Sequence, residues 1–380
     1  MLYIHIPFCA SHCSYCAFYS TTSTELLTTY YTTLLQEIRY SHLLHGDSNT
    51  PIQSIFFGGG TPSFVPAEYI ATILEELQKQ YSFSDTIEIT LEANPESITK
   101  EKATIWYQSG INRVSVGCQS MISETLHLLQ RIHSVEGIYT AIDILRESAF
   151  YNISVDMIWG HCNHTVERWL YELKSILSLE IQHLSCYSLT IEENTLLAEQ
   201  YTLHTMLPTE EELCSLYFAG KNFLEEHGYM QYETSNFAKV GYECKHNIGY
   251  WNDIPYYGYG PSASSYNGKA RYKHPSSIQA WSSCITQCCK KKKELPHKEI
   301  RTIENIYTEY LLLGLRQTKG ISLTTINTYC SIPFEIYYKT QLEALITDGL
   351  LIYNNDTLCV TPKGMLVVDA IIREFIDIPQ

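Results

Sequence analysis

The sequence predicts an α/β protein built around one parallel sheet, open or curled into a partial barrel. An extension and a small winged-helix-like α+β domain are expected to follow the sheet. Three observations support this fold class. Short apolar runs alternate with helix-patterned segments, which is typical of βαβ units. Glycine and polar motifs follow several of these runs, where parallel sheets carry their chemistry. The end of the chain combines three helical patterns with a hairpin.

Each element of the predicted sheet follows from a local pattern. Apolar runs of strand length predict strands at residues 3–6, 52–57, 87–91, 113–116, 153–158 and 183–189. Apolar residues at three- and four-residue steps predict helices at residues 26–38, 66–77, 98–108, 134–148 and 165–179. A further helix over residues 210–227 is expected to begin after the N-cap Thr209 and to end at Gly228.

The second half of the chain divides by composition. Residues 232–266 are rich in Gly, Tyr, Asn and Pro, and this stretch is too long for an idle connection, whereas residues 267–296 have little periodicity and predict a linker. Helices are expected at residues 300–317, 322–329 and 339–348, hairpin strands at 349–353 and 358–361, and a closing helix from Pro362. We therefore expect a core over residues 1–200, an extension with a loop and linker over 201–296, and a winged-helix-like domain over 297–380.

Composition limits the classes of function. The net charge of −15 disfavours nucleic-acid binding, which needs clustered Lys and Arg. Thirteen cysteines, scattered outside the first loop, do not form a disulfide framework and predict a reducing, cytoplasmic location. No apolar run has the length of a transmembrane helix, and the N-terminus lacks the regions of a signal peptide.

Three cysteines near the start of the chain predict a metal centre. Cys9, Cys13 and Cys16 follow the first strand in a C-x3-C-x2-C pattern. Iron–sulfur clusters normally take four cysteines, so three would leave one iron open to another ligand. Zinc is the alternative, but a structural zinc site requires four ligands, for which His12 is the nearest candidate. The spacing favours a [4Fe–4S] cluster.

The residues around this loop resemble a known family. Tyr15 precedes the last cysteine, and the string Tyr3-Ile-His-Ile-Pro-Phe-Cys9 leads into the loop. This combination resembles the radical S-adenosylmethionine (SAM) superfamily, and within it the HemN-like branch. That branch contains oxygen-independent coproporphyrinogen III dehydrogenase and the HemW-type haem chaperones. The resemblance implies a partial (β/α)6 radical SAM barrel, whose cluster binds SAM at the open iron and reduces it to a 5′-deoxyadenosyl radical.

Motifs at the strand ends extend the resemblance. Residues 58–62, Gly-Gly-Gly-Thr-Pro, resemble the family's glycine motif, and residues 91–96 resemble its third-strand motif. Glu92 is expected to face a cationic or hydroxyl group of SAM, and Arg131 its carboxylate. The residues that match SAM-contacting positions are Tyr3, Tyr15, Gly59, Gly60, Thr61, Glu92, Gln119, Arg131 and Asp156.

A second stretch concerns haem. On its residues alone, the segment 246–251, His-Asn-Ile-Gly-Tyr-Trp, is best interpreted as a loop packed over the barrel mouth with a satisfied histidine. The string nevertheless resembles the haem-associated HNxxYW motif of the HemW-type chaperones. That resemblance implies that His246 is a haem ligand and that Tyr250 and Trp251 offer a flat apolar surface to the porphyrin.

Two features favour the chaperone over the dehydrogenase. The dehydrogenases carry a fourth cysteine where this chain has Phe18, and they have an N-terminal extension for which no room remains before Cys9. The resemblance therefore implies a haem chaperone that binds a [4Fe–4S] cluster, SAM and haem, and delivers haem to an acceptor protein. Any membrane contact would be peripheral and made through that acceptor. The alternatives are conversion of coproporphyrinogen III to protoporphyrinogen IX, and a radical enzyme acting on RNA or protein.

One segment departs from the family pattern. After the strand at 153–158 the family usually continues Leu-Pro-Gly-Gln-Thr, whereas this chain has His161-Cys162-Asn163-His164-Thr165. The loop's proline and glycine are absent, so its backbone is expected to differ. The two histidines and the cysteine could also bind a metal, but we interpret the segment as a diverged turn.

Overall fold

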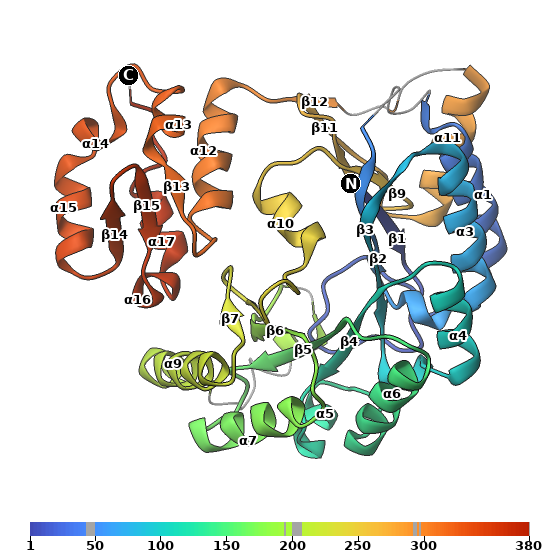
Figure 1. The fold of residues 1–380 in the computed structure, drawn as a ribbon. Coiled ribbons are helices and arrows are strands. Elements are labelled where there is room, and N and C mark those ends of the chain that lie inside the picture. The colour runs from blue at the N-terminus through green and yellow to red at the C-terminus, as the bar shows by residue number, and fades with distance from the viewer. Residues whose placement is uncertain (43–49, 194, 200–206, 292–294, 296–297, 380) are drawn as a thin grey trace.

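A nine-stranded sheet is the centre of the computed structural model, which describes residues 1–380 except 43–49, 194, 200–206, 292–294, 296–297 and 380 (Figure 1). The strand order is β7-β8-β6-β5-β4-β3-β2-β1-β9. The predicted strands form its parallel middle: β1 (Leu2–Ile6), β2 (Ile52–Gly59), β3 (Phe83–Ala93), β4 (Arg113–Gln119), β5 (Ile153–Trp159) and β6 (His183–Ser188). Because these six strands run in parallel, their carboxyl ends lie along one edge of the sheet.

Three short strands extend the sheet beyond the predicted six. On one side, β8 (Asn236–Ala238) pairs antiparallel with β6, and β7 (Met230–Gln231) pairs with β8. On the other side, β9 (Tyr257–Tyr259) pairs in parallel with β1. Each has only two or three residues, so none offers enough alternation to be recognised from sequence.

The helices that follow the strands lie on the outer, convex side of the curled sheet (Figure 1). They bury apolar stripes against the strands. In α3 (Ala67–Gln80), for example, Ile70, Ile73 and Leu77 are buried. The predicted capping of α9 (Glu210–Glu226) is confirmed, since Thr209 and Glu212 form a capping box at its start. In chain order these helices are α1 (Leu27–Arg39), η1 (Pro62–Phe64), α3 (Ala67–Gln80), η2 (Pro95–Ser97), α4 (Lys100–Gln108), α5 (Ser123–Leu128), α6 (Val135–Glu147), α7 (Val166–Leu177) and α9 (Glu210–Glu226).

The predicted linker over residues 267–296 is wrong. This segment contains β11 (Ala270–Lys273), which pairs with β10 (Ser264–Tyr266) and β12 (Lys298–Ile300), and then α11 (Ile278–Lys291). The α11 helix packs on α1, where the indole of Trp281 donates to the carboxylate of Glu37 over 3.2 Å. Its buried residues recur at helical steps, but Ser, Gln and Cys between them obscure the pattern.

The C-terminal domain has the predicted order of helices and hairpin. Its elements are α12 (Ile303–Gly314), β13 (Ile321–Ser322), α13 (Leu323–Asn327), α14 (Phe334–Tyr337), α15 (Lys339–Thr347), β14 (Leu351–Asn354), β15 (Thr357–Val360), α16 (Pro362–Met365) and α17 (Val368–Arg373). The three strands form one sheet in the order β13-β15-β14, and the rings of Phe334, Tyr338 and Phe375 pack together in the core. The expected domain boundaries, 200/201 and 296/297, lie outside the described residues.

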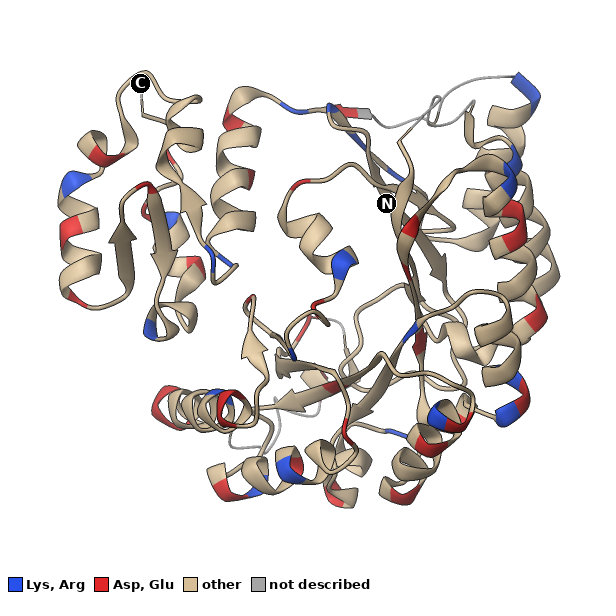
Figure 2. Ribbon diagram, in the orientation of Figure 1, with Lys and Arg blue, Asp and Glu red and all other residues tan. Residues whose placement is uncertain are grey.

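One helix occupies the concave side of the sheet. The α10 helix (Lys245–Trp251) contacts β2 and α12, and Figure 1 shows it between the strands and the C-terminal domain. Acidic and basic residues are interspersed over the outer helices (Figure 2). Among the helices that the structure describes, none combines the length and the apolar character needed to cross a bilayer.

Candidate functional site

A pocket of about 460 Å³ opens at the carboxyl ends of the parallel strands. It is lined by most of the side chains that the sequence predicts for the cluster and for SAM, namely Cys9, Cys13, Cys16, Tyr15, Gly59, Gly60, Thr61, Glu92, Gln119, Arg131 and Asp156. Tyr3 and His246 are not among them; they line a second cavity of about 180 Å³ deeper in the sheet. The two spaces adjoin, since Glu92, Ser115, Asp156 and Tyr187 border both.

Backbone hydrogen bonds close the cysteine loop. Thr21 donates its N–H to the carbonyl of Pro7 over 2.7 Å, and Cys9 donates to the carbonyl of Thr21 over 3.0 Å. A tight turn follows, in which Cys16 N–H donates to the carbonyl of Cys13 over 3.2 Å. The loop therefore leaves β1 and returns to it, which directs its three thiols into one pocket.

The surroundings of the thiols fit an iron–sulfur cluster. Arg131 Nη1 donates to Sγ of Cys13 over 2.9 Å, and Thr61 Oγ1 donates to Sγ of Cys9 over 3.5 Å. Burial raises the pKa of the Cys9 and Cys16 thiols, so both are protonated until a metal displaces the protons. A cationic group and a hydroxyl aimed at the sulfur atoms would stabilise them as thiolate ligands.

The glycine turn after β2 packs directly on the cysteine loop. Gly59 has φ +112°, and a Cβ there would lie 2.6 Å from the ring of His5, while a Cβ at Gly60 would lie 2.7 Å from the backbone of Pro7. Only glycine fits this approach. Gly60 N–H donates to Ile6, and Thr61 N–H donates to Phe8, each over 2.8 Å. The main chain of this turn therefore forms part of the pocket wall.

Two carboxyl groups face the pocket from β3 and β5, the strands on either side of β4. Burial, and then the nearby charge of Asp156, raise the pKa of Glu92 to about 8. Burial also raises the pKa of Asp156, although Ser115 Oγ donates to its carboxylate over 3.2 Å. Glu92 accepts a hydrogen bond from Gly59 N–H over 3.2 Å. A cationic group of a ligand between the two acids would favour their ionised forms.

Asn94 is a site residue that the sequence reading quoted within a motif but did not assign. Its Nδ2 donates to Thr61 Oγ1 over 3.1 Å, and its Oδ1 accepts from Arg131 Nη2 over 2.7 Å. Arg131 also donates to the carbonyl of Gly117 over 3.2 Å. Asn94 therefore joins the glycine turn to the arginine that contacts Cys13. The only sequence signal for Asn94 is a polar side chain directly after β3, within the motif at residues 91–96.

Gln119 ends β4 in an unusual conformation. Its φ is +62°, and the pairing register between β4 and β5 shifts between Gly117 and Gln119. Left-handed backbone is costly for a residue with a side chain, so the surrounding structure must impose it. The Gln119 side chain borders the pocket, and among the described residues its Oε1 has no hydrogen-bond partner. This oxygen can accept a hydrogen bond from a ligand.

His246 occupies the inner cavity rather than the pocket. It is 1% exposed, its Nδ1 lies 2.9 Å from Ser54 Oγ, and its backbone N–H donates to Glu88 over 3.2 Å. Its ring packs between Phe56 and Tyr250. Burial, and then the N-terminal amine, lower the pKa of His246 to about 3, so the ring is neutral. Its Nε2 is buried and has no hydrogen-bond partner among the described residues.

The size of the inner cavity restricts what can bind beside His246. Cavities that enclose drug-sized ligands measure roughly 300–1,000 Å³. The cavity here measures about 180 Å³. The space beside His246 is by itself too small to enclose a porphyrin, but it adjoins the larger pocket. Tyr3, whose hydroxyl lies 3.1 Å from Nδ1 of His5, borders the same cavity.

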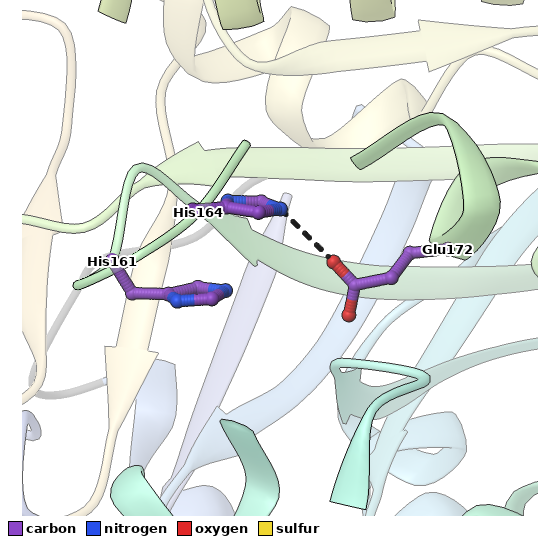
Figure 3. A group of neighbouring side chains, drawn as sticks. All are labelled: His161, His164 and Glu172. Carbon is purple, nitrogen blue, oxygen red and sulfur yellow. Dashed lines mark ion pairs between the residues drawn. The ribbon is translucent and has the colours of Figure 1, made fainter. Parts of the chain in front are cut away.

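The segment that departs from the family pattern forms the predicted turn. His164 N–H donates to the carbonyl of His161 over 3.1 Å, and Asn163 has φ +57°. The side chains of His161 and His164 in this turn lie beside that of Glu172 from α7 (Figure 3).

Two parts of the chain match known protein families. Residues 3–175 match the Radical SAM superfamily, and residues 302–367 match the HemN C-terminal domain. A protein of Haemophilus influenzae named heme chaperone HemW is 32% identical, with 99% of this chain and 97% of the relative aligned. The protein of the same name from Bacillus subtilis is 30% identical, with 98% of each chain aligned.

A solved structure agrees over the same length. The coproporphyrinogen III oxidase HemN of Escherichia coli, a radical SAM enzyme, matches with a TM-score of 0.82, covering 98% of this chain and 89% of that one. At 22% identity this match establishes the fold, including the predicted partial radical SAM barrel and the small C-terminal domain. The chain belongs to the HemW family of HemN-like radical SAM proteins.

Proposed function

We propose that this protein is a haem chaperone that holds a [4Fe–4S] cluster on Cys9, Cys13 and Cys16, binds SAM in the adjoining pocket, and delivers haem to an acceptor protein. The observation that carries the proposal is the convergence of the three thiols with the glycine turn, two acids and Arg131 on one pocket, in a chain whose full-length relatives are named haem chaperones.

Different residues of the pocket would bind the cluster and the separate groups of SAM. Arg131 and Thr61 stabilise the sulfur ligands, and the main chain at Gly59 and Gly60 presents the pocket wall to the methionine end of SAM. Glu92 and Asp156 offer acceptors to its cationic and hydroxyl groups. A reduced cluster held by these residues would supply the one electron that cleavage of SAM requires. The protein contributes position and exclusion of water.

We propose that His246 is a ligand of the haem iron. Its buried Nε2 has no partner among the described residues, so this nitrogen is available to an iron atom. Burying an unpaired ring nitrogen costs free energy unless it gains a ligand. Movement of α10 away from β2 would expose both His246 and Tyr250. We propose that haem binding accompanies such a movement.

A second candidate function is oxidative decarboxylation of coproporphyrinogen III, because the fold matches HemN. The residue at the position of the dehydrogenases' fourth cysteine argues against it. Phe18 stands there, 74% exposed at the mouth of the pocket, and it can neither bind metal nor transfer a proton.

Two incubations of the anaerobically reconstituted protein test the proposal. With haem, we expect roughly one haem per chain, measured by the Soret band after gel filtration. With coproporphyrinogen III, SAM and a competent reductant, we expect no protoporphyrinogen IX. Formation of protoporphyrinogen IX with 5′-deoxyadenosine released in step would replace the chaperone with the enzyme.

A further inference from the structure

We propose that His161, His164 and Glu172 form a binding site for a divalent transition-metal ion, for which Zn²⁺ is the probe. Their potential ligand atoms all lie within 4.8 Å of one another (Figure 3). The three residues are 2%, 4% and 0% exposed. They come from the turn after β5 and from α7, so an ion here would join two elements of the fold.

His161 has the hydrogen bonding of a metal ligand. Its Nδ1 lies 3.1 Å from the carbonyl oxygen of Cys162, and a carbonyl can only accept, so Nδ1 carries the proton. The lone pair of a neutral imidazole is then on Nε2. Among the described residues this buried Nε2 has no hydrogen-bond partner. Metal-bound histidines typically donate their second ring nitrogen to a carbonyl in this way.

Glu172 is positioned in the same manner. One carboxylate oxygen, Oε1, accepts hydrogen bonds from Ser120 Oγ and from Met121 N–H, the latter over 2.9 Å. The other oxygen, Oε2, faces His164 Nε2 at 3.1 Å. The contacts at Oε1 fix the carboxylate and leave Oε2 for an ion, as in sites where the ligating carboxylate is itself hydrogen-bonded.

His164 holds a proton where the metal would bind. Gly160 N–H donates to its Nδ1 over 3.0 Å, so in the metal-free protein the ring proton is on Nε2. This Nε2 lies 3.1 Å from Glu172 Oε2, but neither atom has a hydrogen-bond partner among the described residues. Metal binding must therefore move that proton from Nε2 to Nδ1, which breaks the contact with Gly160 N–H. The loss of one hydrogen bond is small beside the free energy that zinc binding releases in folded metal sites.

The ligand set limits the choice of ion. Two imidazoles and one carboxylate suit Zn²⁺ and Fe²⁺, whereas Mg²⁺ and Ca²⁺ require mainly oxygen ligands. Three protein ligands leave one position of a tetrahedral ion for a water molecule or another small ligand. The three residues are buried, so the ion would hold the turn and α7 together. It would fix the turn that replaces the family's proline and glycine. Through Glu172 it would also fix Ser120 and Met121, which follow the pocket residue Gln119.

The test is zinc analysis of the cluster-loaded, full-length protein. With Cys9, Cys13 and Cys16 occupied by iron, zinc retained after dialysis reports other sites. We expect one zinc per chain, a raised melting temperature, and only nitrogen and oxygen scatterers in the zinc X-ray absorption spectrum. His161→Ala should weaken zinc binding at least about 100-fold.

Two further variants complete the design. Glu172→Gln should weaken zinc binding comparably. Asn163→Gly removes a side chain of the same turn that offers no ligand atom to the site and tolerates the positive φ of this position, so this variant should retain zinc. Absence of retained zinc, sulfur scatterers, or equal affinity in wild type and His161→Ala would overturn the proposal. Circular dichroism and cluster content identify any variant that has failed to fold.

Discussion

Arg131 donates a hydrogen bond from Nη1 to Sγ of Cys13 over 2.9 Å, and this contact joins the cysteine loop to the carboxyl ends of β3 and β4. The same guanidinium donates to Asn94 and to the carbonyl of Gly117. One side chain, which sequence reading assigned to the SAM carboxylate, thus also positions the sulfur that is expected to hold iron.

Replacing Arg131 tests this double role. In Arg131→Gln, loss of the positive charge beside Cys13 should make the cluster harder to reduce and should weaken SAM binding about 10- to 100-fold. Redox titration and calorimetric titration of the reconstituted protein measure the two effects. The control is Arg39→Gln, which removes the charge of an exposed side chain on α1 that lies outside the pocket and pairs with Glu76 of α3. Wild-type behaviour in Arg131→Gln would show that the contact has no such role.

Glu92 predicts a pH dependence of stability. Its pKa rises from 4.5 to about 8 in the folded protein because of burial and the charge of Asp156. A folded pKa above the unfolded value means that the free energy of unfolding falls as the pH rises from 4.5 through about 8. Glu92→Gln can still accept from Gly59 N–H but cannot ionise. Relative to wild type, it should therefore gain at most about 1.4 kcal/mol per pH unit across this window.

Thermal unfolding of ligand-free protein at several pH values measures this effect. The melting temperature of Glu92→Gln minus that of wild type should grow between about pH 5 and about pH 8. A difference that does not change with pH would contradict the assignment of the raised pKa to Glu92. The same variant should bind SAM more weakly, because a neutral amide replaces a partner for the cationic groups of the ligand.

The glycine turn allows a matched comparison of two glycines. Gly59 and Gly110 both have positive φ, +112° and +103°, but only Gly59 is crowded, since a Cβ there would lie 2.6 Å from His5. Gly110→Ala should cost about 1–2 kcal/mol of unfolding free energy for backbone strain alone. Gly59→Ala should cost a further 1–3 kcal/mol or so for overpacking, and should also impair cluster loading. If urea denaturation shows the same loss of unfolding free energy in both variants, the close approach of Gly59 to His5 is not rigid.

The haem proposal is tested by two buried histidines. His246 and His183 both contact a serine hydroxyl through Nδ1, but His183 Nε2 also pairs with Tyr232, whereas His246 Nε2 has no partner among the described residues. We expect His246→Ala to shift or weaken the Soret band of bound haem, and His183→Ala to leave it unchanged. An unchanged Soret band in His246→Ala would place the haem ligand elsewhere in the chain. Cluster content should not change in either variant.

The parts of the fold that sequence predicts correctly are those with long periodic patterns or strong local signals. The strand that ends in Gly58-Gly59-Gly60 and the helix capped by Thr209 are examples. The strands β7 and β9 escape prediction because two or three residues carry no period, and tertiary pairing alone defines them. The buried stripe of α11 escapes prediction because Ser and Gln residues between its buried positions weaken the apolar periodicity.

In the functional site, too, some features are predictable from sequence and others depend on tertiary packing. Cysteine spacing and strand-end motifs place Cys9, Glu92 and Arg131 around one pocket. The contact between Arg131 and Asn94 and the position of His246 in a separate, smaller cavity depend on how distant segments pack. Residue type and spacing cannot specify such distances.

The most direct test of the account is the electron paramagnetic resonance spectrum of the reduced, anaerobically reconstituted protein. We predict about four irons and four sulfides per chain, and a signal that changes when SAM is added, because three cysteines leave one iron open. Replacing Cys9, Cys13 and Cys16 with alanine should remove both the iron and the signal. A triple variant that retains full iron and sulfide, or a wild-type signal indifferent to SAM, would contradict the assignment of these thiols as the cluster ligands beside a SAM site.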